Sequence, residues 1–282
     1  MQLEYDTVHM HSCDRSSTIY PDWHLRLALR DEGSVISTSS KCILTVSFLG
    51  KLLQSRREQA LNKNVMTEFQ YTEEVEIPFG NISLTGDLII PIGADSIILF
   101  AHGSGSSRHS SRNRFVARVL QDAGFATLLF DLLTRKEDED YAKRFQIDLL
   151  TERLIGATSW IENRPEFDLN IGYFGASTGA AATLEAAARL GDVIGAVVSR
   201  GGRPDLAIFN LPLVKSPTSL IVGGLDHQVI ELNQKAYKAL DVEKELVIIE
   251  GATHLFEEPG TLEQVADHAA KWFRRHLKHV AV

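Results

Sequence analysis

Cysteine is scarce in this sequence, and none occurs after residue 65. The 282 residues contain only Cys13 and Cys42. Residues 66–282 can therefore form no disulfide, no thiolate metal site and no cysteine nucleophile. A reducing cytoplasm is the compartment that we expect for such a chain.

Long apolar runs and an excess of basic residues are also missing. No apolar run approaches the roughly 18 residues that suggest a membrane span, and nothing predicts a signal peptide. Lys and Arg number 29 against 37 Asp and Glu, which gives a formal net charge of −8. A nucleic-acid-binding protein needs a clustered basic face. We therefore expect neither a membrane nor a nucleic acid as partner.

The chain divides into two parts of different character. Residues 1–65 sum to a charge of +1 and show no sustained periodicity, whereas residues 66–282 sum to −9 and are regularly patterned from Val75 onward. We expect residues 1–65 to be a poorly ordered N-terminal extension and residues 66–282 to form one domain.

Two kinds of strand follow one another in that domain. Two alternating segments, Val75–Ile77 and Ile82–Ile90, flank a turn and predict a hairpin. Short, almost continuous apolar runs follow, as is typical of strands buried on both faces of a parallel sheet. These runs are Ile97–Ala101, Phe125–Phe130, Ile171–Phe174, Val193–Val198, Ser219–Val222 and Leu246–Ile249.

Helical patterns alternate with these runs, because apolar residues recur at spacings of three and four. The order predicts an α/β fold, a doubly wound and mostly parallel sheet flanked by helices. The connection from Ser199 to Ser219 is too short for a large cap domain. The predicted helices are Asn113–Ala123, Tyr141–Asn163, Thr178–Leu190, Val229–Leu240 and Thr261–His276.

A serine between two glycines follows the third of these runs. Gly175-Ala-Ser177-Thr-Gly179 fits the G-x-S-x-G elbow, placed after a strand and before a helix. That turn exposes a serine hydroxyl at the carboxyl edge of the sheet, where open α/β sheets bind ligands. We interpret Ser177 as a nucleophile; the alternative is a small-residue structural turn.

A serine nucleophile needs a base, and the base needs a group that orients it. His254 follows the last predicted strand, which makes it the candidate base. Asp226 follows the strand before it and is the candidate acid, with Asp205 as the alternate; His227 is expected to point elsewhere. The order Ser177, Asp226, His254 is that of α/β-hydrolases.

The loop after the first parallel strand supplies the remaining candidates. The backbone N–H groups of Thr178 and Ser104 are expected to form the oxyanion hole. The loop has neither a dinucleotide fingerprint nor a P-loop, so we expect no cofactor, and we expect no metal. Substrate-binding candidates in it are His102, Gly103, Gly105 and Arg108.

Residues 75–280 resemble the dienelactone hydrolase-like group of α/β-hydrolases. The resemblance is carried by "AHGSGSSRHSSRNRFVARVL", "FGASTGAAATLEAA", "SRGGRPDLA", "IVGGLDHQV" and "GATHLFEEPG", in the family's order. It implies the α/β-hydrolase fold and an ester mechanism without cofactor. Dienelactone hydrolases use cysteine as nucleophile, whereas serine stands at position 177, which favours a general carboxylic-ester hydrolase.

Together these features predict a serine hydrolase that cleaves small carboxylic esters or lactones through an acyl-enzyme, as a monomer or homodimer. Thioester hydrolysis or acyl transfer on the same triad is an alternative. A binding or regulatory module that keeps the hydrolase scaffold without turnover is another.

Overall fold

The computed structural model describes residues 68–164 and 166–277. Met1–Asn64 and Val65–Val282 separate into two units. The expected N-terminal extension, residues 1–65, lies outside the described residues, and everything below concerns the second unit.

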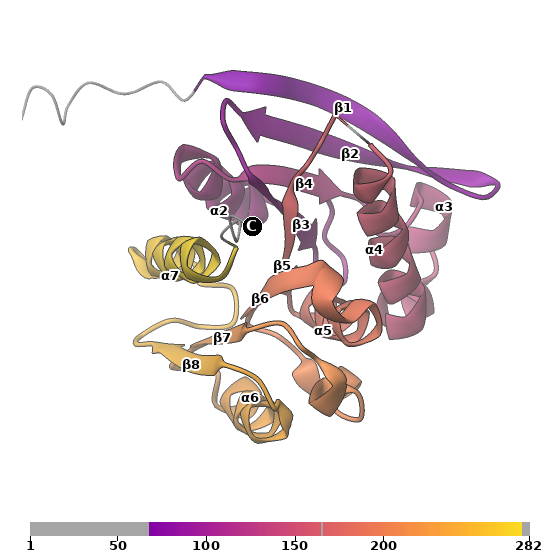
Figure 1. Ribbon diagram of the computed structural model, residues 1–282. Coiled ribbons are helices and arrows are strands. Elements are labelled where there is room, and N and C mark those ends of the chain that lie inside the picture. The colour runs from indigo at the N-terminus through magenta and orange to yellow at the C-terminus, as the bar shows by residue number, and fades with distance from the viewer. Residues whose placement is uncertain (1–67, 165, 278–282) are drawn as a thin grey trace, which may run out of the picture. The chain divides into compact units, whose positions relative to one another are not determined.

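The described chain opens with a hairpin at the edge of the sheet (Figure 1). β1 (Phe69–Phe79) pairs antiparallel with β2 (Ile82–Pro91), and Phe79 lies opposite Ile82. Gly80 has a φ of +60° in the two-residue turn, a conformation that glycine adopts without steric cost. The hairpin expected from the sequence is confirmed, but β1 begins six residues earlier than Val75, with a first half that is mostly exposed and still pairs with β2.

Eight strands form one sheet in the order β1-β2-β4-β3-β5-β6-β7-β8. β2 and β4 are antiparallel, and every pair from β4 to β8 is parallel. All residues of β3, β4 and β7 are buried, which explains their almost continuous apolar sequences. The remaining strands are β3 (Ser96–Ala101), β4 (Ala126–Phe130), β5 (Asn170–Ala176), β6 (Ile194–Arg200), β7 (Thr218–Gly223) and β8 (Lys244–Ile249).

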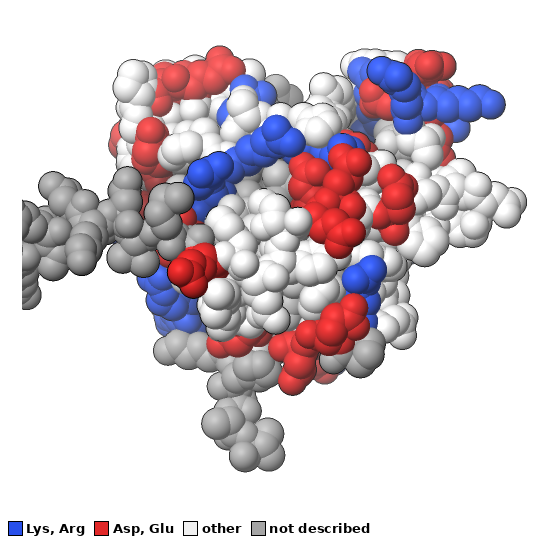
Figure 2. All heavy atoms as spheres, turned by 90° about the horizontal axis from the view of Figure 1, so that it is seen from above, with Lys and Arg blue, Asp and Glu red and all other residues white. Residues whose placement is uncertain are grey.

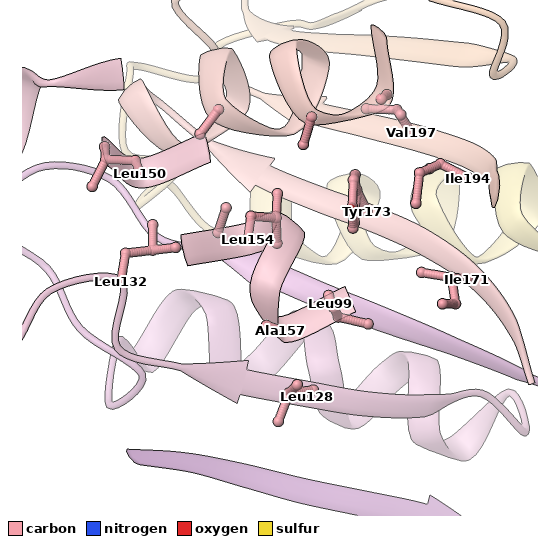
Figure 3. Packing of buried hydrophobic residues seen from close by; sticks show 14 of the residues in the cluster. Leu99, Leu128, Leu132, Leu150, Leu154, Ala157, Ile171, Tyr173, Ile194 and Val197 are labelled. Atoms are coloured by element: carbon pink, nitrogen blue, oxygen red, sulfur yellow. The ribbon is translucent and has the colours of Figure 1, made fainter. Parts of the chain in front are cut away.

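Helices cover both faces of the sheet (Figure 1). One face packs against α2 (Ser111–Asp122) and α7 (Thr261–His276) in a core that contains Ile98 and Phe273. The other face packs against α4, α5 and α6; Leu154 of α4 and Leu99 of β3 belong to this core (Figure 3). The doubly wound fold is confirmed. The second group of helices comprises α4 (Ile147–Glu162), α5 (Thr178–Leu190) and α6 (His227–Ala239).

The predicted helix Tyr141–Asn163 is wrong in its first turn. A 3-10 turn, η1 (Tyr141–Phe145), precedes α4, and Gln146 between them has φ −77° and ψ 84°. The Asp140 carboxylate accepts the Ala142 N–H and thereby starts a separate turn, an option that short polar side chains give to the backbone.

The connection between β6 and β7 contains only two 3-10 turns, η3 (Pro204–Ala207) and η4 (Leu211–Leu213). No cap domain is inserted at this point of the described chain, as the sequence predicts. The carboxyl edge of the sheet is therefore left open beside β6 and β7.

Candidate active site

Ser177 occupies a strained elbow between β5 and α5. Its φ of 52° and ψ of −119° place a non-glycine residue in a conformation that side chains disfavour. Its N–H donates to the Arg200 carbonyl at 3.2 Å, and its carbonyl accepts the N–H groups of Ala180 and Arg203, each at 3.1 Å. Backbone hydrogen bonds from both sides thus hold the strain in place.

The two glycines of the motif are required by close packing rather than by backbone freedom. A Cβ on Gly175 would lie 2.5 Å from Ala180 Cα, and one on Gly179 would lie 2.2 Å from the Ala101 carbonyl oxygen. Real Cβ atoms do not approach other atoms so closely. The glycines let α5 press against the ends of β3 and β5, which fixes where Ser177 stands.

His254 and Asp226 meet at the ends of the last two strands. His254 Nδ1 lies 2.6 Å from Asp226 Oδ2, and the side chains are 39% and 16% exposed. Because Nδ1 is bonded to the carboxylate, Nε2 is the ring atom left for another partner. Gly223 permits the approach of the two loops, since a Cβ there would lie 2.5 Å from the Thr253 carbonyl oxygen.

The alternate acid, Asp205, has a different partner. Its two carboxylate oxygens accept Arg203 Nε and Nη2, each at 2.8 Å. Such a bidentate pair satisfies the carboxylate. The structure thus brings Asp226, and not Asp205, to His254, while His227 is exposed at the first turn of α6.

Ser177 and His254 line one cavity of about 150 Å³. Its other walls come from the segment after β6 and the first turns of α6, where Val229 supplies a buried apolar surface. Sequence reasoning missed these walls, although Arg203 stands only three residues after a strand end. The other lining residues are Arg203, Gln228, Val229 and Leu232.

The expected oxyanion donors adjoin each other. Gly103 packs against the serine, because a Cβ on it would lie 3.1 Å from Ser177 Cβ. The next residue, Ser104, donates its N–H to Thr178 Oγ1 at 2.9 Å. The Thr178 N–H lies in the first turn of α5, where backbone donors have no partner inside the helix. The Ser104 N–H is therefore already engaged in this structure, and its oxyanion role stays a prediction.

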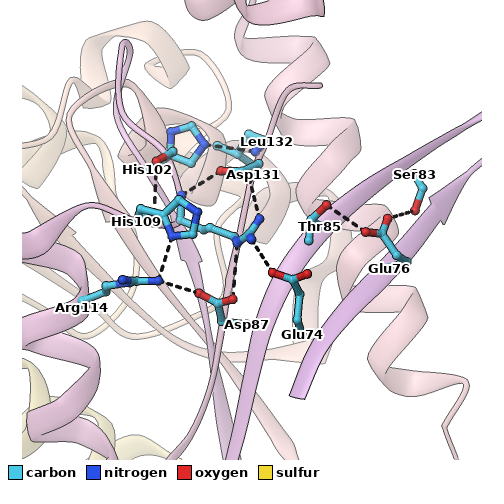
Figure 4. Close-up of polar contacts among 12 residues, drawn as sticks. Glu74, Glu76, Ser83, Thr85, Asp87, His102, His109, Arg114, Asp131 and Leu132 are labelled. Atoms are coloured by element: carbon cyan, nitrogen blue, oxygen red, sulfur yellow. Dashed lines mark hydrogen bonds and ion pairs between the residues drawn. The ribbon is translucent and has the colours of Figure 1, made fainter. Parts of the chain in front are cut away.

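Two of the expected substrate-binding side chains hold the scaffold instead. His102 is buried, its Nδ1 lies 3.0 Å from the Gly103 carbonyl, and its Nε2 accepts the Leu132 N–H at 3.1 Å (Figure 4). Burial lowers the pKa of His102. Both ring nitrogens are thus committed to the backbone, which joins the loops after β3 and β4.

Arg108 is enclosed by acidic groups. Its guanidinium pairs with Glu74, Asp87 and Asp131 at 2.6, 3.3 and 3.2 Å, and its side chain is 12% exposed. Glu74 and Asp87 tie the loop after β3 to the opening hairpin, and Asp131 ties it to the end of β4 (Figure 4). Three carboxylates already bind the Arg108 guanidinium, so the geometry favours an anchoring role over the expected contact with substrate. Gly105, with φ +69°, lines a narrow crevice beside Gly103.

A buried arginine, which the sequence did not single out, supports the elbow. The carbonyl of Arg200 accepts the Ser177 N–H, while its guanidinium lies over Phe256 at 5.8 Å. Burial, and then the charge of Arg112, lower the pKa of Arg200 to about 10. Nε and Nη1 of Arg200 have no hydrogen-bond partner among the described residues. A positive charge that has no carboxylate partner among the described residues thus lies at the end of β6.

Other kinds of site find no support within residues 68–164 and 166–277. No group of three metal-ligating side chains comes together there. None of the helices described is both long and apolar enough to cross a membrane. On the side that carries β1, acidic and basic side chains adjoin one another and no broad basic patch is visible (Figure 2).

Comparison with known proteins agrees with this architecture. A sequence model of the dienelactone hydrolase family matches residues 88–280. The chain belongs to the dienelactone hydrolase family. A solved dienelactone hydrolase from Anabaena variabilis is 54% identical, with 74% of this chain and 99% of that chain covered and a TM-score of 0.72. Membership of the dienelactone hydrolase family supports a hydrolase.

Two further proteins that are similar to this chain support different conclusions, one about its fold and one about its length. Est1E from Butyrivibrio proteoclasticus is 16% identical, with 72% and 98% of the two chains covered and a TM-score of 0.63, which shows a shared fold. A Mycobacterium tuberculosis protein, provisionally named a phosphoribosyl transferase, is 56% identical over 206 residues. The match covers 73% of this chain but 46% of that relative, so the chain spans about half its length.

Proposed function

We propose that this protein is a serine hydrolase of carboxylic esters or lactones, with Ser177 as nucleophile, His254 as base and Asp226 as the orienting acid. One observation carries the proposal: the His254–Asp226 hydrogen bond of 2.6 Å and the strained Ser177 meet at one cavity. A structural turn would need neither the strained serine nor a paired histidine beside it.

The geometry supports a two-step reaction. Ser177 Oγ attacks the carbonyl carbon while His254 Nε2 takes its proton, and the carbonyl electron pair moves onto oxygen. Collapse of this intermediate expels the alcohol, which receives the proton from His254, and leaves an acyl-enzyme. Water, activated by His254, then releases the acid. Asp226 holds the imidazole in the required tautomer and stabilises its cation.

The cavity suggests the size of the substrate. A volume of about 150 Å³ with Val229 and Leu232 on its wall suits a short acyl group. The absence of an inserted cap between β6 and β7 leaves the remainder of the substrate in solvent. We infer small or flexible esters; the activity of the longer mycobacterial relative is not transferred, because more than half of that protein is unmatched.

The proposal is tested by hydrolysis of p-nitrophenyl acetate by the full chain. Ser177→Ala is expected to lower kcat by roughly 10⁴- to 10⁶-fold, as loss of a triad serine does elsewhere. Ser199→Ala is the matched control, because its buried hydroxyl at the end of β6 has no partner in the described chain. Full turnover by Ser177→Ala would show that another residue performs the chemistry.

A further inference from the structure

The hydrogen bond between Ser104 and Thr178 changes the expected oxyanion hole. Gly103 and Ser177 are in contact, and the residues that follow each of them, Ser104 and Thr178, are joined at 2.9 Å. The bond therefore lies directly beside the nucleophile. It uses the only hydrogen of the Ser104 N–H, the group from which a second oxyanion donor was expected.

Thr178 has an unused donor of its own. A threonine hydroxyl can accept one hydrogen bond and donate another. Thr178 Oγ1 accepts from Ser104, and no acceptor for its proton is present in residues 68–164 or 166–277. Thr178 as a whole is 2% exposed, so bulk water is largely kept from it. A buried hydroxyl proton without an acceptor is unfavourable unless a ligand supplies one.

We propose that the Thr178 hydroxyl is itself an oxyanion donor, held in place and polarised by the Ser104 N–H. The inference rests on the proposed function. Thr178 donates twice to the carbonyl oxygen, from its backbone N–H at the start of α5 and from its hydroxyl. Ser104 is then a positioning residue, because its N–H acts through Thr178 Oγ1. An accepted hydrogen bond strengthens the one that a hydroxyl donates.

The Thr178 hydroxyl is expected to act mainly in the transition state, where negative charge develops on the carbonyl oxygen. As Ser177 attacks, the carbonyl oxygen gains the electron pair of the broken π bond, and the hydroxyl donates to it without giving up its proton. Such preorganised donors stabilise the transition state more than the bound ester. Loss of the hydroxyl is therefore expected to lower kcat and to leave KM nearly unchanged.

The experiment compares Thr178→Val, which keeps the shape and removes the hydroxyl, with Thr178→Ser, which keeps the hydroxyl. The full chain hydrolyses p-nitrophenyl acetate, and a trifluoromethyl ketone serves as inhibitor because it forms a tetrahedral oxyanion on the serine. Thr178→Val is expected to lose about 10²- to 10³-fold in kcat and to weaken the inhibitor by a similar factor, with KM changed less than about threefold. Thr178→Ser is expected to stay within about fivefold of the parent.

Thr183→Val is the matched control. Thr183 lies on the same helix, is fully buried, and its hydroxyl donates to the Ala180 carbonyl. This variant should keep its inhibitor affinity and kcat. If Thr178→Val fails to fold, Thr178→Ala takes its place with the same expectation.

Three results would overturn the inference. They are unchanged kcat in Thr178→Val, an equal loss in Thr178→Ser, and a loss in Thr183→Val as large as that in Thr178→Val. The first measurement is whether the parent protein hydrolyses the ester and whether Ser177→Ala abolishes this activity, as the proposed function requires. A failure of the proposed function is thus distinguishable from a failure of the role proposed for the Thr178 hydroxyl.

Discussion

The loops after β3 and β8 each place a histidine at the carboxyl edge of the same sheet, yet the two rings are bound in opposite ways. His102 is 8% exposed and binds backbone groups with both nitrogens. His254 is partly exposed, binds the Asp226 carboxylate through Nδ1, and borders the cavity of Ser177. His102 therefore has no ring nitrogen left to contact a substrate, whereas His254 has Nε2.

The partners of a histidine thus decide its role more than its place at a strand end. Burial lowers the pKa of His102, and a proton on Nε2 would remove the acceptor of the Leu132 N–H. A carboxylate partner favours the cation that a general base must become. The following predictions test this contrast, from the largest effect to the smallest.

The histidine substitutions should have opposite consequences. His254→Gln is expected to lower kcat for p-nitrophenyl acetate by roughly 10⁴- to 10⁶-fold, because the serine loses its base, with the midpoint of urea unfolding little changed. His102→Gln is expected to keep kcat per folded molecule within about fivefold while lowering the free energy of unfolding by about 1–3 kcal/mol. If both variants lost activity equally at equal stability, the contrast would be wrong.

Substitutions of Asp226 and Asp205 should have different effects on kcat in the same assay. Asp226→Asn is expected to lower kcat by about 10⁴-fold, since an amide cannot stabilise the imidazolium and favours the wrong tautomer. Asp205→Asn is the matched control and should stay within about threefold, because its carboxylate binds Arg203. The assignment of the acid fails if Asp205→Asn is the more damaging change.

Arg108 tests whether the loop after β3 is an anchor. Arg108→Met removes the partner of three carboxylates and is expected to lower the free energy of unfolding by about 1–3 kcal/mol, which is a few degrees in Tm. Arg114→Met is a control, because Arg114 is about half exposed and pairs with Asp87 alone among these carboxylates. A large rise in KM with unchanged Tm in Arg108→Met would restore the substrate-binding role.

The titration of His102 should contribute to the pH dependence of the free energy of unfolding. Burial lowers the pKa of folded His102, whereas the unfolded residue takes up its proton near pH 6.5. Below that pH the unfolded state binds more protons, so stability is present above about pH 6.5 and is lost as the pH falls. Between pH 7.5 and 5.5 the parent should lose more of its free energy of unfolding than His102→Gln does in urea titrations. Identical losses would contradict this.

Much of the fold could be predicted because its signals are local. Buried parallel strands are continuous apolar runs, and α5 and α7 begin and end where the sequence predicts. The elbow could be predicted as well, since a strand, two glycines and a helix lie within eleven residues. The break at Gln146, where η1 ends and α4 begins, could not be read from the spacing of the apolar residues.

The pairing of distant side chains was harder to predict. Chain order pointed to Asp226 and His254, but only the fold shows that Asp205 is occupied by Arg203. The three carboxylates around Arg108 come from β1, β2 and the end of β4, and no spacing in the sequence reveals that they converge. The engagement of the Ser104 N–H by Thr178 is of the same kind.

Covalent labelling tests the central claim most directly. A fluorophosphonate loses fluoride as an activated serine oxygen bonds to its phosphorus, so only a serine with a working base reacts rapidly. The account predicts that the folded protein gains one adduct, that peptide mass spectrometry places it on Ser177, and that Ser177→Ala and His254→Gln gain none at the same rate. A folded protein that stays unlabelled, or a label that persists in Ser177→Ala, would contradict it.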